Sequence, residues 1–246
     1  MSIDLAQGRV QRLRQEVVHR ELQVLRVESP SPHMRAVTFA GAELAGFHSP
    51  SFDDHVKFIF GADAAGAPLR RDYTPRRHDA AAGELTLEFA LHGDGPGAAW
   101  AAQAAPGQNA VVAGPRGSFV IPLDYDWHVL AGDATALPAI ARRLEELPAG
   151  ARVSVLLQLD AAERRPLASA AAVALQWLDD EAQLLAAARA LALPPGDGYV
   201  WCAGEAGAVA ALRRIFVEEK GLDRKAIRAA AYWKRGAVGH HENLDG

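Results

Sequence analysis

One cysteine, Cys202, occurs among the 246 residues, and this scarcity removes several classes of protein. A single thiol cannot form an intrachain disulfide, and it leaves no CxxC pair for a redox centre or a zinc module. No segment approaches the roughly 18 consecutive apolar residues of a membrane-spanning helix, and the first residues lack the pattern of a signal peptide. We therefore expect a cytoplasmic protein without membrane insertion.

Metal-binding and common hydrolytic motifs are also missing. The nine histidines are scattered, and His240 and His241 have no carboxylate or cysteine partners nearby, so no metal site is predicted. GxSxG, Walker A and HExxH segments are absent. The net charge of −4 argues against a nucleic-acid partner, although it is compatible with a local basic pocket.

What the sequence does contain is apolar residues, which make up 50% of a chain long enough for one large or two small domains. Short segments of β type fill the first half and are separated by turns rich in Gly, Pro and Asp, which is typical of an antiparallel β-barrel or sandwich. One alanine-rich helix, 97–105, interrupts them. The predicted strands are 21–28, 34–40, 55–60, 84–91 and 110–114.

The second half alternates apolar strands with helices, which predicts an α/β domain with a mainly parallel, doubly wound sheet. We expect two domains, an antiparallel β-barrel over 1–124 and an α/β domain over 125–246. The predicted strands are 127–131, 153–159, 173–177, 198–203 and 227–233, and the predicted helices are 135–147, 181–193 and 205–220.

Three segments of the first half have residues suited to a phosphate-bearing, flat ligand. In 71–76, arginine offers a planar fork for phosphate, tyrosine can stack on a heterocycle, and threonine supplies a hydroxyl. In 92–100, glycines and a proline lead into a helix, whose free N–H groups suit a pyrophosphate. Arg116, in the turn 114–117, is a candidate anion contact. Alternatively, 71–76 is a solvated charged turn, 92–100 is an ordinary helix cap beside a structural His92, and Arg116 is a surface arginine.

In the second half, the loop 131–138 joins a strand to a helix without a GxGxxG pattern. Asp133 or Thr135 is suited to cap that helix, and the same geometry turns helix N–H groups toward a dinucleotide phosphate. Glu205 begins another helix, where an acidic residue complements the dipole. The segment 232–236 is either an aromatic lid with an anion contact or a plain strand end. Cys202, in an apolar strand, is interpreted as packing rather than as a nucleophile.

Seven segments, in order and spread over nearly the whole chain, resemble the siderophore-interacting protein family, ferric-siderophore reductases among the ferredoxin-reductase-like flavoenzymes. The chain departs from the family at Ala134, where glutamate is common, and slightly in the 93–97 loop. The matching segments are Asp54–Lys57, Arg71–Arg76, Leu91–Trp100, Gly114–Gly117, Gly132–Ala139, Ala203–Glu205 and Tyr232–Gly236.

The resemblance implies an FAD-binding barrel followed by an NAD(P)H-binding domain, with Arg71 toward phosphate, Tyr73 against the flavin or ribityl, and Thr74 near flavin N5. No protein residue is expected to be catalytic, because FAD carries the chemistry. The predicted cofactor-binding residues are Arg71, Tyr73, Thr74, Arg76, His92, Gly93, Gly95, Pro96, Gly97, Ala98, Trp100, Asp133, Thr135 and Trp233.

The same resemblance implies electrons from NADPH, NADH or a ferredoxin and a ferric siderophore as substrate. Ferric chelates are often anionic, so we expect Lys57, Arg116, Lys234 and Arg235 to recruit them. Arg164 and Arg165, after the second strand of the nucleotide domain, slightly favour NADPH over NADH, although an exposed arginine pair explains them equally well. Two alternatives remain: a general flavin or ferredoxin-coupled oxidoreductase, and a non-catalytic siderophore-binding protein, which only Ala134 favours.

Overall fold

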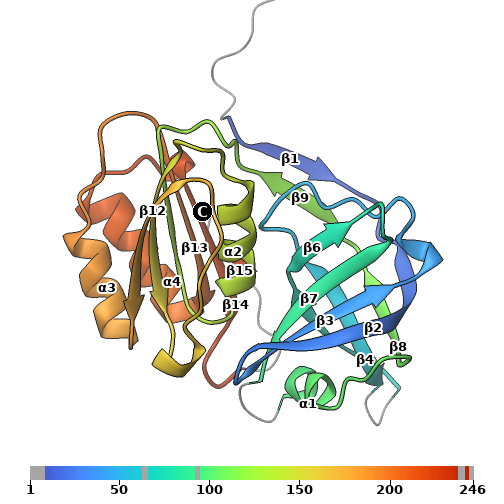
Figure 1. The fold of residues 1–246 in the computed structure, drawn as a ribbon. Coiled ribbons are helices and arrows are strands. Elements are labelled where there is room, and N and C mark those ends of the chain that lie inside the picture. Colours follow the sequence, from blue (N-terminus) through green and yellow to red (C-terminus); the bar gives the residue numbers. More distant parts are fainter. Residues whose placement is uncertain (1–8, 63–65, 92–94, 238–241, 244–246) are drawn as a thin grey trace, which may run out of the picture. The chain divides into compact units, whose positions relative to one another are not determined.

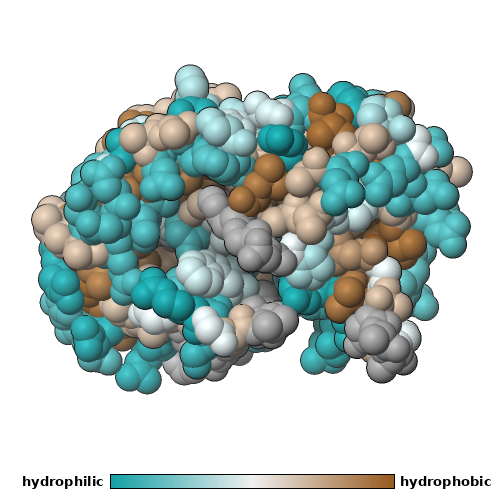
Figure 2. All heavy atoms as spheres, turned by 90° about the horizontal axis from the view of Figure 1, so that it is seen from below, coloured by the Kyte–Doolittle hydropathy of each residue, from teal (hydrophilic) through white to brown (hydrophobic). Residues whose placement is uncertain are grey.

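The protein is described by a computed structural model over residues 9–62, 66–91, 95–237 and 242–243. The chain divides between Pro122 and Leu123 into two compact units, each of which is described by itself (Figure 1). Hydrophilic side chains cover most of the surface visible in Figure 2, and hydrophobic ones form small separate groups there. Within the described ranges, no helix is both long and apolar enough to cross a membrane.

The first unit is a curled antiparallel sheet that forms a half-barrel, with the strand order β5-β4-β8-β2-β3-β7-β6. A separate pair, β1 and β9, is also antiparallel. The strands are β1 (Gln11–Arg14), β2 (His19–Ser31), β3 (Met34–Ala40), β4 (Val56–Ala62), β5 (Pro68–Tyr73), β6 (Pro75–Asp79), β7 (Glu84–Ala90), β8 (Asn109–Ala113) and β9 (Gly117–Val120). Short 3-10 helix η1 (Ala42–Leu44) and helix α1 (Pro96–Ala102) complete the unit.

Aromatic rings fill the interior of the half-barrel. Phe58 on β4 lies 5.3 Å from Phe89 and 4.5 Å from Trp100, centroid to centroid. Trp100 belongs to α1, so this short helix is fixed to the core by its own indole ring. Tyr73, the last residue of β5, packs 4.3 Å from Phe89 and joins the same cluster. The position of α1 is therefore set by packing inside this unit.

The second unit is a six-stranded sheet with the order β12-β11-β10-β13-β14-β15, in which β15 alone is antiparallel to its neighbour. The strands are β10 (Trp127–Gly132), β11 (Arg152–Gln158), β12 (Ala172–Leu178), β13 (Gly198–Glu205), β14 (Ile227–Trp233) and β15 (Glu242–Asn243). The helices are α2 (Leu137–Glu146), α3 (Glu181–Ala190) and α4 (Ala206–Arg214), with short turns η2 (Ala161–Glu163), η3 (Ile215–Glu219) and η4 (Arg224–Ala226).

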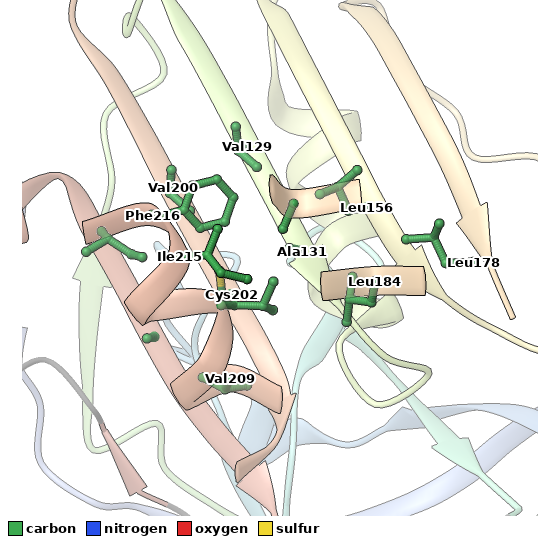
Figure 3. Packing of buried hydrophobic residues seen from close by; sticks show 14 of the residues in the cluster. Val129, Ala131, Leu156, Leu178, Leu184, Val200, Cys202, Val209, Ile215 and Phe216 are labelled. Carbon is green, nitrogen blue, oxygen red and sulfur yellow. The ribbon is translucent and has the colours of Figure 1, made fainter. Parts of the chain in front are cut away.

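One core of the second unit lies between the sheet and helices α3 and α4, and Figure 3 shows its side chains interleaving from both layers. Val129 and Cys202 come from adjacent central strands, and Leu184 and Val209 come from the two helices. Helix α2 covers the opposite face of the sheet (Figure 1). Cys202 is completely buried, and this burial raises the pKa of its thiol, which agrees with a packing role.

The predicted fold class is confirmed: an antiparallel barrel-like sheet precedes a mainly parallel α/β sheet. Five described strands were not predicted from the sequence. Four of them, β1, β5, β6 and β9, lie in the first unit, and the fifth is the short β15. The helix predicted over 205–220 is α4 followed by the π-helical turn η3. The charged run Arg70–Asp72 has no apolar alternation, so its strand state depends on pairing with β4.

Candidate functional site

Arg71 and Tyr73 lie on the inner face of the half-barrel. They pair with Phe58 and Val56 on β4, and both partners are fully buried. Directly opposed residues of an antiparallel pair share a face of the sheet, and neighbours along a strand alternate. Asp72 therefore lies on the outer face. The two residues that the sequence suggested for phosphate and ring contacts point the same way.

Tyr73 on β5 packs against the glycine-rich segment at Gly97. A Cβ atom added to Gly97 would lie 2.1 Å from the Tyr73 hydroxyl oxygen, so only glycine allows this approach. Burial raises the pKa of Tyr73, although the charge of Arg71 opposes the shift, so the phenol stays protonated at neutral pH. The structure thus brings together Arg71, Tyr73 and the first turn of α1.

The first turn of α1 has no side-chain cap. Gly95 is the N-cap residue in extended conformation, and Pro96 begins the helix. The N–H groups at the start of a helix have no intrahelical acceptors, so those of Gly97 and Ala98 suit the oxygens of a phosphate. Two further predicted residues of this segment, His92 and Gly93, lie outside the described residues.

The polar residues of 71–76 differ in their burial and in the contacts that they make. The guanidinium of Arg71 donates from Nη1 to the carbonyl of Arg70 at 2.8 Å and keeps further donors for a ligand. Thr74 is buried, with 7% of its surface exposed. Arg76 lies 3.6 Å from Glu88 across mostly buried side chains. Arg76 is therefore neutralised within the sheet, whereas Arg71 is the better phosphate contact.

Two of the cationic residues predicted to recruit the substrate belong to this unit, and their environments differ. Lys57 donates to Asp72 at 2.6 Å on the outer face of β4 and β5, so it does not share the face of Arg71 and Tyr73. Arg116 is exposed in the segment before β9, where its carbonyl accepts from the amide of Gln15. Of the two, Arg116 has the more available charge.

In the second unit, Asp133 joins the ends of three strands. Its Oδ1 accepts from the Thr135 amide at 2.8 Å and from the Thr135 hydroxyl at 2.5 Å. Its Oδ2 accepts from the Glu205 amide at 2.9 Å and from Nε1 of Trp233 at 2.8 Å. The predicted residues Asp133, Thr135 and Trp233 are therefore one hydrogen-bonded cluster, and Glu205 is a member that the sequence analysis interpreted as an acidic residue complementing a helix dipole.

This cluster occupies the point where the strand order reverses. β10 and β13 are adjacent, and the chain runs from β10 to β11 on one side and from β13 to β14 on the other. In open α/β sheets, ligands bind outside the carboxyl ends of the strands at such a point. Gly132 ends β10 and Gly204 is the residue before the last of β13, and both are closely packed. A Cβ on Gly132 would lie 2.3 Å from the Ala203 carbonyl, and one on Gly204 would lie 2.5 Å from Asp133 Oδ2.

Glu205 anchors the other loop of the cluster. Its Oε2 accepts from the amides of Gly207 and Ala208 as the cap of α4, and its Oε1 accepts from the amide of Arg235. Partial burial by itself would raise the pKa of Glu205, but the three backbone hydrogen bonds outweigh it and lower the pKa. Lys234 and Arg235 are exposed just beyond β14. The positive charge of Arg235 therefore lies near a carboxylate whose ionised form is favoured.

Arg164 and Arg165 follow η2, after the carboxyl end of β11. Arg164 pairs with the Asp179 carboxylate and donates from Nε to the Leu159 carbonyl at 3.3 Å. Because β11 is parallel to β10 and adjacent to it, this segment lies at the same edge of the sheet as Asp133. No group of three His, Cys, Asp or Glu side chains suited to a metal ion occurs in the part of the chain that the structure describes.

The first unit fits an FAD molecule on its own geometry. Gly97 permits the close approach of the Tyr73 hydroxyl, the start of α1 has no side-chain cap, and Arg71 has donors beyond the one bonded to the Arg70 carbonyl. A flat ring system and a pyrophosphate need a surface of this kind. A half-barrel of this kind followed by a parallel α/β sheet is a ferredoxin-reductase-like architecture.

The chain belongs to the siderophore-interacting protein family. Residues 125–236 match the family model described as "Siderophore-interacting protein", and residues 23–69 and 62–119 match "Siderophore-interacting FAD-binding domain". The chain is 37% identical to an NADPH-dependent ferric-chelate reductase of Escherichia coli, covering 91% of this chain and 96% of that protein. It is 32% identical to a ferric vibriobactin reductase, ViuB, of Vibrio cholerae, covering 90% and 92%. A siderophore utilization protein from T. fusca is similar in structure, with a TM-score of 0.87, 35% identity and coverage of 94% and 98%.

Proposed function

We propose that this protein is an FAD-dependent, NAD(P)H-using reductase of ferric siderophores, with residues 1–124 as the flavin domain and 125–246 as the nucleotide domain. The proposal is carried by the contact of Tyr73 with the Gly97 turn, which lies inside the region matched by the FAD-binding family model. The 37% identity to a ferric-chelate reductase over nearly the whole chain supports the reaction.

In this proposal, the residues of the first unit hold the cofactor. Arg71 and the amides of Gly97 and Ala98 bind its phosphates, and Tyr73 and Thr74 contact its ring or ribityl chain. Trp100 and Arg76 support the site, because Trp100 packs in the aromatic core and Arg76 pairs with Glu88. When bound, FAD supplies the chemistry by accepting hydride from a nicotinamide and releasing electrons singly to Fe(III).

In the second unit, the cluster of Asp133, Thr135, Glu205 and Trp233 orients the nicotinamide nucleotide. Its hydrogen bonds fix the loops after β10 and β13, so the amides at the start of α2 are held in place for phosphate. Fe(III) enters as substrate, already wrapped in its chelator, and needs no ligand from the protein. Reduction to Fe(II) weakens the binding of iron by a chelator with hard oxygen donors, because such donors prefer Fe(III). The iron is then released.

An anaerobic assay tests the proposed reaction. Purified protein is expected to be yellow, to bleach on mixing with NADPH, and to recover its colour when a ferric siderophore is added with a ferrous trap. Formation of the ferrous complex should follow the reoxidation of flavin in a ratio of two Fe(II) to one NADPH. Colourless protein that binds ferric siderophores without Fe(II) formation would instead support a non-catalytic role.

Substitution of cations tests substrate recruitment. We expect Arg116→Ala and the pair Lys234→Ala/Arg235→Ala each to raise KM for an anionic ferric chelate about three- to tenfold, with less effect at high salt. Lys57→Ala serves as the comparison, because its charge is already paired with Asp72, and its KM should change less. FAD content should stay constant in all three. An unchanged KM in both test variants would remove these residues from the substrate site.

Nucleotide preference tests the arginines after η2. Because they lie at the edge of the sheet that bears Asp133, we expect kcat/KM to favour NADPH over NADH and Arg165→Ala to lower the NADPH value about tenfold. The value for NADH is the internal control and should not change. Arg164→Ala, which removes the guanidinium that pairs with Asp179, is the neighbouring comparison. A wild-type preference for NADH would contradict this role.

The proposal places the protein in the cytoplasm, where NADPH is available. A ferredoxin is the second candidate electron donor in this proposal. It is tested by adding reduced ferredoxin to the same assay in place of nicotinamide nucleotide.

A further inference from the structure

Strand β12 forms one outer edge of the six-stranded sheet, and no other described strand pairs with its free side. Figure 3 shows it as the outermost strand, which carries Leu178. The opposite edge of the sheet is covered, since the short antiparallel strand β15 pairs with β14 there. An edge strand presents unpaired backbone N–H and C=O groups, which can pair with another chain. No residue of β12 takes part in the proposed reaction.

The backbone groups on the free side of β12 belong to alternate residues. The Ala172 amide donates to the Ala151 carbonyl at 2.8 Å, and the Leu178 carbonyl accepts from the Leu159 amide at 2.9 Å. Both residues therefore turn their backbone groups toward β11, and the residues between them alternate in direction. Those that turn their backbone groups to the free side, where no described residue pairs with them, are Val173, Leu175 and Trp177.

The features that normally protect an edge strand do not occur in β12. Its sequence, Ala-Val-Ala-Leu-Gln-Trp-Leu, contains neither a charge nor a proline, and its register with β11 is regular. The outer strands of the first unit differ. β5 and β6 begin with Pro68 and Pro75, carry charged residues and pair with a register shift. Charges, prolines and bulges block edge-to-edge pairing, so their absence from β12 indicates an edge that takes a partner.

This edge is complementary to itself in the antiparallel direction. When Leu175 lies opposite Leu175 of a second copy, Val173 lies opposite Trp177, and all three residues offer backbone groups to their counterparts. Such pairing makes about six N–H···O=C hydrogen bonds and brings three apolar pairs together on one face of the sheet. Val173 is 37% exposed in the single chain, so the pairing also covers apolar surface.

The residues that flank β12 are compatible with this register. Asp179 and Asp180 follow the strand, and they fall opposite Ala171 and Ala170 of the second copy, so no like charges face each other. Because β10, β11 and β12 are parallel, the edges that bear Asp133 in the two copies lie at opposite ends of the joined sheet. A two-fold dimer needs one surface that matches itself, and β12 is such a surface. We propose that the chain forms a symmetric homodimer in which two β12 strands pair antiparallel about Leu175.

Sedimentation velocity of the full-length protein tests the dimer. The chain of 26.2 kDa should shift with concentration toward twice that mass, with a dissociation constant of about 1–100 μM, as expected for a small interface. Leu175→Lys places two cations opposite each other, and Leu175→Glu places two anions, so each variant alone should be monomeric. An equimolar mixture of the two should dimerise again, because the opposed charges then attract.

Two exposed positions supply a second variant and its matched control. Val173→Lys places a charge opposite Trp177 at both ends of the interface and should weaken the dimer about tenfold. Leu25→Lys introduces the same charge on β2, where Leu25 is 45% exposed, and should dimerise as the wild type does. Leu175 is half-buried, so thermal midpoints check that its variants fold, and Val173→Lys gives the answer if they do not.

Disulfide formation tests the register. Cys202 is completely buried, so Leu175→Cys adds a thiol that an oxidant reaches selectively. Directly opposed residues have Cα atoms about 5.5 Å apart, which a disulfide can span. Val173→Cys is the control, because the two copies of residue 173 are about 14 Å apart in this register. With oxidised glutathione, Leu175→Cys should cross-link at concentrations where the wild type dimerises, and Val173→Cys should not.

Three results would overturn the proposal. A wild-type protein that stays monomeric at millimolar concentration would leave the edge of β12 to a strand of another protein. Dimers that persist in Val173→Lys and in both Leu175 variants would place the interface elsewhere on the chain. Equal cross-linking of Leu175→Cys and Val173→Cys would exclude pairing about Leu175.

Discussion

Gly97→Ala is expected to yield protein that has lost most of its flavin. The new Cβ would lie 2.1 Å from the Tyr73 hydroxyl and 3.1 Å from Cζ of Phe60. Tyr73 cannot easily give way, because its ring packs 4.3 Å from Phe89 in the aromatic core. Either Tyr73 or the first turn of α1 must move, at a cost of about 1–3 kcal/mol in stability. The ratio of flavin to protein absorbance and the thermal midpoint measure both effects.

The neighbouring glycine provides a matched control. A Cβ on Gly95 would meet nothing within 4 Å, so Gly95→Ala should retain its flavin and lose at most about 1 kcal/mol as a weaker N-cap. Tyr73→Phe removes the clashing oxygen and leaves Cζ at 3.4 Å from the new methyl group. The double variant Gly97→Ala/Tyr73→Phe should therefore recover thermal stability. If Gly97→Ala alone keeps full flavin and stability, this contact does not shape the flavin site.

Asp133→Ala is expected to lower kcat/KM for NADPH about 100-fold while FAD content stays constant. The substitution leaves the amides of Thr135 and Glu205 and the indole of Trp233 without their acceptor. Unpaired, partly buried donors of this kind cost about 1–3 kcal/mol each, so both loops should loosen. Stopped-flow bleaching of the flavin by NADPH measures the rate, and the proposed FAD residues all lie in the first unit.

Two further variants separate the role of Asp133 from a general loss of charge. Asp160→Ala removes an exposed carboxylate beyond β11 that caps no amide, and it should behave as wild type. Trp233→Phe removes one of the four hydrogen bonds to Asp133, so its rate should fall between wild type and Asp133→Ala. Equal NADPH kinetics in Asp133→Ala and wild type would mean that the cluster only joins the strands.

Sequence reasoning succeeded where a pattern determines structure locally. The apolar runs Met34–Ala40 and Ile227–Trp233 were predicted with the bounds that β3 and β14 have. It failed for β5 and β6, because charged residues such as Arg70 and Arg77 do not resemble a strand. Their extended state comes from pairing with β4 and β7, which are distant in sequence.

The candidate site shows the same difference between features set by the local sequence and features set by contacts with distant residues. Tyr73 and Gly97 were each selected from the sequence, but their contact depends on packing that spacing along the chain does not encode. The cluster of Asp133 was likewise predicted in pieces, and the glycines at or next to the ends of the central strands, Gly132 and Gly204, were the available signal. The outward direction of Lys57 was accessible from the sequence, since it alternates with Val56 and Phe58, which are both buried.

The reversal of strand order sends the two loops of the Asp133 cluster toward helices on opposite faces of the sheet. The loop after β10 leads into α2 on one face of the sheet, and the loop after β13 leads into α4 on the other (Figure 1). Each loop thus leads into the packing of a different face of the sheet, while the hydrogen bond from the Glu205 amide to Asp133 joins the two loops. Ala134, where the family commonly has glutamate, lies in the first of these loops. A substitution at position 134 therefore changes the loop of the proposed nucleotide site without replacing a side chain of the core between the sheet and helices α3 and α4.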